Sequence, residues 1–431
     1  MAYIPPQKRH SMALERPFVT PAEGLLPQFK TYADLQHLMS SRRPSPIPEL
    51  FSPRFNKYLN VRPYKPKVDR SGLIMYGDNA ITVWCAVGLD RNNQFPSSLH
   101  LEPVSVEPIE RKTGEKPLVL VNTQLGKEND ERRGNALKRP WEFLAETVWP
   151  DLLSSFKFVR NEMKCQKYEE VKPMLVARFG KILYNGSNSM NLENIRGDRV
   201  SEATLKQLKR LFHTNVPNTY MENIMNVVVP KIGVDFEEEK DIYHLKLSDI
   251  RRPDSTISCK CIINEDKMLE MYKVELNQVR HLVVDVSCLE KDLDLRLMLS
   301  TKRILTALSD EEVHSIRNLI NSAVLDPEVK GGLRWPMGLG YYGNRYRVIG
   351  VWHTKVKSYK SPSLRLKVRY ADRSDFKSGT GEATMEITLQ LKRLVSEMQE
   401  DKLEYGSIYD MFQDTIRLIW DNFLCCDQFL T

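Results

Sequence analysis

The stretch Asp292-Leu-Asp-Leu-Arg-Leu297 decides the fold class, because charged residues and leucines alternate along it. A period of two places the charged side chains on one face of a β-strand and the leucines on the other. The same alternation occurs in the segments 242–247, 271–276 and 364–370. The C-terminal half of the chain therefore contains long strands, each with one polar and one apolar face.

Few helices interrupt these strands. One begins at the capping box Ser309-Asp-Glu-Glu312, and an amphipathic helix over about 408–424 closes the chain. Successive strands without a regular alternation with helices are typical of antiparallel α+β proteins. We therefore predict an α+β fold of mainly antiparallel sheet with a few packed helices, preceded by a disordered basic leader.

Composition divides the 431 residues into three predicted parts. Residues 1–70 hold 12 Lys+Arg, five acidic residues and 11 of the 24 prolines, a composition that opposes regular structure. This Pro-rich leader carries the whole excess of positive charge. An N-terminal α+β subdomain is predicted over 71–235, and a sheet-rich subdomain with its closing helix over 236–431. The acidic run Glu237–Asp241 is interpreted as a surface turn at their boundary.

Several protein classes are excluded by the sequence. The longest uncharged apolar run, Ala80–Leu89, is about half the length of a membrane-spanning helix, so we expect no membrane association. The seven cysteines form no recognisable zinc or disulfide pattern, which favours a reducing compartment, the cytoplasm or the nucleus. Nucleophile elbows, phosphate loops and dinucleotide fingerprints are absent from the sequence. We expect no cofactor, and a role in binding rather than catalysis.

Residues 331–370 form the first candidate site, because they contain nine Lys and Arg and no acidic residue. Arg365, Lys367 and Arg369 recur at a spacing of two, which would align them on one strand face about 7 Å apart. Neighbouring aromatic residues could stack on bases. This pattern predicts non-catalytic binding of RNA or another polyanion through Arg334, Trp335, Tyr341, Tyr342, Arg345, Arg347, Lys355, Lys357, Arg365, Lys367 and Arg369. A solvated sheet face with the aromatic residues in the core would explain the same pattern.

Rows of mixed charge suggest an alternative, in which the strands close around their charged faces. Carboxylates could then hold Mg²⁺ or Mn²⁺ while lysines and arginines hold phosphates, as in triphosphate-tunnel phosphohydrolases. The candidate ligands are Asp292, Asp294 and Glu386. The Glu-x-Glu-x-Lys strand expected of such enzymes is missing. Cross-strand ion pairs on a solvated sheet would also account for these rows.

The N-terminal segment Tyr3-Ile-Pro-Pro-Gln-Lys-Arg-His10 is a third candidate. It resembles the Tyr-x-Pro-Pro-x-x-Arg element that opens some DEAD-box RNA helicases of the translation machinery. A proline-stiffened aromatic residue followed by basic residues suits a short docking motif for a protein partner. An interaction adaptor is therefore a further alternative.

Longer stretches resemble a land-plant protein family whose members open with MAYIPPHKRH. The matching stretches are the opening MAYIPPQKRHS, Ile242–Asp249, Asp292–Arg303, Lys330–Pro336 and Gly350–Thr354. Residue 7, usually histidine in that family, is glutamine here. The resemblance covers essentially the whole chain. It implies a plant origin and supplies no activity.

Overall fold

The structure is a computed structural model. It describes residues 67–68, 74–75, 80–88, 95, 98–123, 139–165, 169–186, 200–276, 278–305, 308–336, 345–400 and 405–426. Nearly all of the predicted leader, including the docking segment 3–10, lies outside the described residues. Lys65–Thr431 forms one compact unit.

Eight strands of the main sheet close into a ring in which every neighbouring pair is antiparallel. The strands of the ring, in spatial order, are β12 (Asp294–Leu305), β10 (Leu269–Leu276), β9 (Arg252–Ile263), β8 (Asp235–Asp249), β15 (Tyr346–Lys360), β16 (Leu364–Asp375), β17 (Thr380–Leu391) and β6 (Glu169–Asn185). β6 then pairs with β12 along the whole length of β12, whereas β10 meets β12 only where Glu275 lies opposite Ile304. The predicted antiparallel α+β fold is confirmed.

The remaining strands extend the sheet beyond the ring or form short pairs. β11 (Val279–Cys288) pairs with β12 and, in parallel, with β3 (Ile81–Val87). β5 (Leu118–Asn122) and β7 (Lys209–His213) pair with β6, and β4 (Leu99–Pro103) pairs with β5. Two short pairs remain: β1 (Lys67–Val68) with β2 (Ile74–Met75), and β13 (Val324–Leu325) with β14 (Leu333–Arg334).

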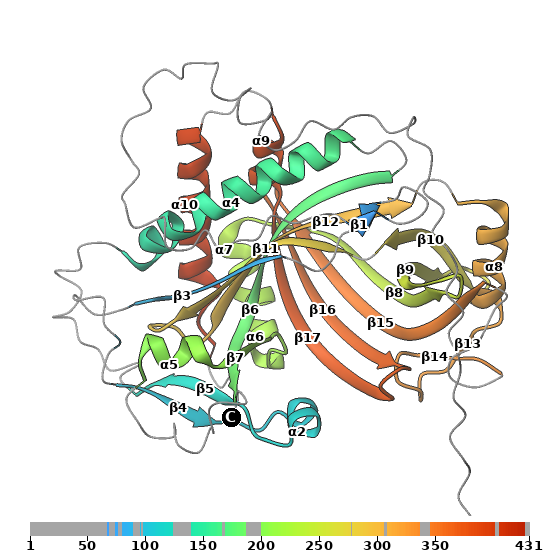
Figure 1. The fold of residues 1–431 in the computed structure, drawn as a ribbon, viewed down its shortest axis with the longest axis horizontal. Helices are drawn as coiled ribbons and strands as arrows, with labels where there is room; N and C mark the ends of the chain where they lie inside the picture. The colour runs from blue at the N-terminus through green and yellow to red at the C-terminus, as the bar shows by residue number, and fades with distance from the viewer. Residues whose placement is uncertain are drawn as a thin grey trace, which may run out of the picture. The chain divides into compact units, whose positions relative to one another are not determined.

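Helices cover the outside of the ring. α4 (Pro140–Cys165), α9 (Lys392–Gln399) and α10 (Tyr405–Asn422) lie together on one side of it (Figure 1). They share a core with buried strand residues such as Leu175, Leu299, Leu366 and Leu389. α8 (Asp310–Asn321), which begins at the predicted capping box, lies beside β8, β9 and β10 (Figure 1). Smaller helical segments are α2 (Glu107–Thr113), α5 (Glu202–Gln207), α6 (Asn218–Asn223), η3 (Ile224–Val228) and α7 (Val229–Ile232).

These outer cores fix which strand residues face the interior of the ring. Leu366 and Val368 pack under the helices, so the alternate residues of β16 point inward. On β9, Cys259 and Cys261 are buried beneath α8, as expected of core thiols, and Lys260 between them points inward. The charged strand faces therefore line the inside of the ring.

Strand pairing crosses the predicted boundary between subdomains. β6 belongs to the first predicted subdomain and completes a ring made otherwise from the second. The acidic run Glu237–Asp241 lies within β8, so its interpretation as a surface turn is wrong. These acidic residues can lie within a strand because basic partners such as Lys360 and Arg365 neutralise Glu237. The division into two subdomains itself stays a prediction.

None of the helices in the described part of the chain is both long and apolar enough to cross a membrane.

Candidate functional site

The predicted basic row lies on β16 and points into the ring. Arg365, Lys367 and Arg369 alternate with residues that are buried under the outer helices. Lys367 is in register with Thr388 of β17, and Arg369 with Glu386. The shared face predicted from the spacing is therefore present, but it faces the interior of the ring.

The other predicted residues do not form one surface with this row. Lys355 and Lys357 of β15 are in register with Tyr370 and Val368, which places them on the opposite face of the sheet from Arg369. The prediction of one continuous basic and aromatic face on the outside is wrong, because the alternation of β15 and β16 divides it between the two faces.

Trp335 is a core residue. Its side chain is 2% exposed, and its ring Nε1 donates a hydrogen bond to the carbonyl of Leu319 at 2.9 Å. The prediction that Trp335 stacks on a base is therefore wrong, because α8 and its surroundings cover the indole. Tyr341 and Tyr342 lie outside the described residues.

Acidic partners hold three of the predicted arginines. Arg365 lies 2.6 Å from Glu237 and 2.9 Å from Glu238. Arg334 Nε lies 2.7 Å from Asp326, and Arg345 lies 2.7 Å from Glu312 and 3.5 Å from Asp249. Glu312 is also the capping-box residue of α8, so Arg345 ties that helix to the sheet. Arg347 also has an interaction partner. The geometry at Arg334 and Arg345 indicates structural ion pairs.

A cluster of cations on five strands faces the inside of the ring. Three carboxylates lie on the same face: Glu275 of β10, and Glu382 and Glu386 of β17. Its cations are Arg178 on β6, Lys260 on β9, Lys273 on β10, Lys302 on β12, and Lys367, Arg369 and Arg373 on β16. Only Lys367 and Arg369 were predicted. Arg373 follows Arg369 by four residues on the same strand. The other four come from other strands, which the closed ring brings together. We call this group the inward cation cluster.

Glu275 and Glu386 already have ion-pair partners among these cations. Glu275 lies 2.9 Å from Lys260 and 2.8 Å from Lys273. Glu386 lies 2.7 Å from Arg373. Among the described residues, no carboxylate forms an ion pair with Lys302, Lys367 or Arg369. The cluster therefore has more positive charge than the protein itself neutralises.

Burial and the excess of positive charge lower the pKa values of these cations. Burial, and then the charge of Lys260, lowers the pKa of Lys302 to about 7. Burial and the neighbouring Arg369 lower the pKa of Lys367 to about 7 as well. The pKa of Arg369 falls to about 10 through burial and the charge of Arg178. Repulsion of this kind is relieved when an anion enters.

Uncompensated polar atoms lie beside the cations. The Nε of Arg178 and the hydroxyls of Thr384 and Thr388 are buried and have no hydrogen-bond partner among the described residues. Thr388 is in register with Arg178 on one side and Lys367 on the other. Buried polar groups normally have partners. Donors to an anion are therefore present at the same place as the excess charge.

The predicted metal ligands do not come together. Asp294 accepts hydrogen bonds from the backbone N–H groups of Ile182 and Cys288, at 2.8 and 3.1 Å, and Asp292 accepts one from Cys426 at 2.9 Å. Both aspartates thus fasten the chain at the start of β12. The prediction of a shared Asp292, Asp294 and Glu386 site is wrong. The described residues contain no group of three or more His, Cys, Asp or Glu that could hold a metal ion.

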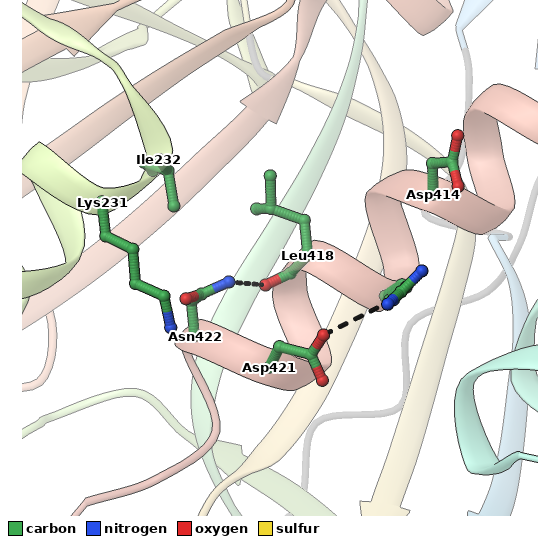
Figure 2. A pocket seen from close by; sticks show the side chains of 7 residues that line it. Lys231, Ile232, Asp414, Leu418, Asp421 and Asn422 are labelled. Atoms are coloured by element: carbon green, nitrogen blue, oxygen red, sulfur yellow. Dashed lines mark hydrogen bonds and ion pairs between the residues drawn. The ribbon is translucent and has the colours of Figure 1, made fainter.

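A separate surface pocket of about 340 Å³ lies between α7 and α10. Two of its polar groups have partners within α10: Asn422 donates to the carbonyl of Leu418 (Figure 2), and Asp421 pairs with Arg417. None of the predicted site residues lines it. The inward cation cluster is the better candidate, because its Lys302, Lys367 and Arg369 form no ion pair with a carboxylate among the described residues.

Most of the chain matches the model of one protein family. A model described as "Domain of unknown function (DUF7903)" matches residues 68–423. The chain belongs to the DUF7903 family. This range includes the whole ring and the inward cation cluster.

Comparisons with curated proteins and with solved structures assign no activity to the chain. A search of curated proteins found no match. Among solved structures, the chain is similar to the S. pombe Pct1 RNA triphosphatase in complex with the Spt5 CTD, at 10% identity and a TM-score of 0.39, covering 63% of this chain and 92% of that chain. A second Pct1 structure gives 10% identity and a TM-score of 0.37, covering 67% and 92%. This similarity is too low to assign an activity to the DUF7903 chain.

Proposed function

We propose that the ring binds a short phosphate chain on its inward face, as inorganic triphosphate or as the triphosphate of a nucleotide or an RNA 5′ end. The lack of carboxylate partners for Lys302, Lys367 and Arg369 among the described residues supports this most directly. Phosphate oxygens make strong charge-assisted hydrogen bonds with such groups. The polyanion predicted from the sequence is thus a ligand of the interior.

Charge balance favours a chain of phosphates over a single phosphate. The inward cation cluster has seven cations and three carboxylates, a formal excess of four positive charges when all the cations are protonated and the carboxylates ionised. The cations come from five strands around the ring. A single phosphate would reach only a few of them, whereas linked phosphates can contact cations on opposite strands.

The proposal is tested by calorimetric titration of the full chain with inorganic tripolyphosphate at low salt, in the presence of EDTA. The test variant replaces Lys367 and Arg369 by methionine. Because a hydrogen bond to a charged group contributes about 1.5–3 kcal/mol, we expect at least a 100-fold loss of affinity. The matched control is Lys355→Met, a lysine exposed on the other face of β15.

Two results would reject the proposal. One is the absence of tripolyphosphate binding by the unmodified chain at low salt. The other is an unchanged affinity in the double variant. Removing repelling cations relieves strain, so the double variant is expected to fold, and a urea melt checks this.

Metal-dependent phosphate hydrolysis is the second candidate. Burial alone would raise the pKa of Glu275, but Lys302 and Lys260 lower it to about 2, so this carboxylate stays ionised beside the proposed site. Ionised oxygens could bind Mg²⁺ or Mn²⁺ together with the phosphates. The test repeats the titration with Mg²⁺ or Mn²⁺ in place of EDTA and measures released phosphate. Release that depends on either metal supports hydrolysis. Bound tripolyphosphate without release supports binding alone.

Three predictions from the sequence stay predictions. Docking of a protein partner through residues 3–10 depends on a segment outside the described residues. Location in the cytoplasm or the nucleus, and a plant origin, also stay predictions.

A further inference from the structure

Two aromatic side chains lie next to each other on the inward face. His244 of β8 and Trp352 of β15 are in register, and their neighbours Leu245 and Val351 are buried in the outer core beneath α8. Their ring centroids are 6.0 Å apart and their planes differ by 20°. This is an offset-stacked arrangement. Neither side chain is fully buried, so the pair keeps accessible surface inside the ring.

Cations flank this pair on both sides. Lys260 of β9 is in register with His244, and Arg373 of β16 is in register with Trp352. Four neighbouring strands therefore present a row of cation, aromatic, aromatic and cation. Both of these cations belong to the inward cation cluster, so the aromatic surface adjoins the proposed phosphate site.

The backbone leaves room beside the indole. Gly350 is on the same face of β15 as Trp352, two residues earlier, and has no side chain. A Cβ at this position would lie 3.9 Å from Trp352 Cζ3 and 3.1 Å from the carbonyl oxygen of Ser374. Any larger residue here would press on the neighbouring strand and fill the space next to the indole.

The imidazole of His244 contributes an uncharged aromatic surface to the pair. Burial, and then the charge of Lys260, lowers the pKa of His244 to about 3. Its imidazole is therefore neutral at neutral pH. A neutral ring next to an indole, between two cations, suits the flat face of a base, whereas a further cation would suit another phosphate.

We propose that Trp352 and His244 form a seat for a nucleobase, so that the ligand is a nucleoside triphosphate or the triphosphorylated first nucleotide of an RNA. This inference rests on the proposed function, because the phosphates anchor the base. The base would stack on the indole while the phosphates contact Lys260, Lys302 and Arg369. It narrows the ligand from any phosphate chain to one that carries a base.

The test compares three probes on the full chain in EDTA: inorganic tripolyphosphate, ATP and the dinucleotide pppApG. Stacking of a base on an aromatic side chain corresponds to about a tenfold gain in affinity, so ATP should bind about ten times more tightly than tripolyphosphate. Trp352→Leu should remove this preference and leave tripolyphosphate affinity within about twofold. Trp352→Phe should restore part of it. Tyr370→Leu, on the outer face of β16, is the control.

The outcomes separate the two proposals. If tripolyphosphate binds but ATP binds no better, or if Trp352→Leu keeps the preference for ATP, the nucleobase seat is wrong and the phosphate site stands. If none of the probes binds, the proposed function itself fails. If the seat is present, pppApG binding more tightly than ATP indicates an RNA end, and equal affinities indicate a free nucleotide.

Discussion

Replacing Lys302 by methionine should raise the free energy of unfolding at pH 7, although it removes a charge from a charged site. Burial and the charge of Lys260 lower the pKa of Lys302 from 10.5 to about 7 in the folded chain. Between these two values the unfolded chain binds more protons than the folded chain. Lys302 therefore destabilises the fold most at low pH, and stability rises as pH increases through this window.

The magnitude follows from the two pKa values. One pKa unit corresponds to about 1.4 kcal/mol, so the ionisation of Lys302 costs about 4 kcal/mol at pH 7 and about 2 kcal/mol at pH 9. Its coupling to Lys367 makes the measured effect smaller when both lysines are present. We expect Lys302→Met to gain up to about 4 kcal/mol at pH 7 and about 2 kcal/mol less at pH 9.

Urea unfolding followed by tryptophan fluorescence at pH 7, 8 and 9 measures this. The difference between variant and unmodified chain at each pH cancels the contributions of titrating groups that do not interact with Lys302. Lys355→Met, on the exposed face of β15, is the matched control. A Lys302→Met variant that is less stable at pH 7, or whose advantage does not shrink by pH 9, would refute the claim that Lys302 lies in an excess of positive charge.

Two further predictions concern Glu386 on the inward face and Trp335 in the core. Glu386→Gln leaves Arg373 without its carboxylate partner and should cost about 3 kcal/mol of unfolding free energy. Tripolyphosphate should restore more stability to this variant than to the unmodified chain in thermal melts, and equal shifts would contradict the proposed site. Glu265→Gln, exposed in the turn between β9 and β10, is the control. Trp335→Ala removes a buried indole and its hydrogen bond to Leu319, so urea unfolding should show a loss of about 3–5 kcal/mol. A loss below about 0.5 kcal/mol would mean that Trp335 is at the surface after all.

Local pattern was a reliable guide to the strands and to their two faces. The leucines at 295 and 297 do enter the outer core, and Ser309 with Glu312 does cap a helix. Both depend only on the period of a strand or on a hydrogen bond within one turn, which neighbouring residues determine. The pattern failed where a side chain's role depends on distant segments, as with Trp335, whose hydrogen-bond partner is on α8.

The sequence by itself determined an antiparallel α+β protein and placed Arg365, Lys367 and Arg369 on one strand face. It left open whether that face is outside or inside, since alternation separates two faces without naming them. Only the tertiary structure decided this, through the pairing of β6 with β12 that closes the ring. Closure then brings Arg178 close to Arg369, nearly 200 positions away, and Lys302 close to Lys260 and Arg369. Their shared charge, which no local spacing encodes, makes the candidate site.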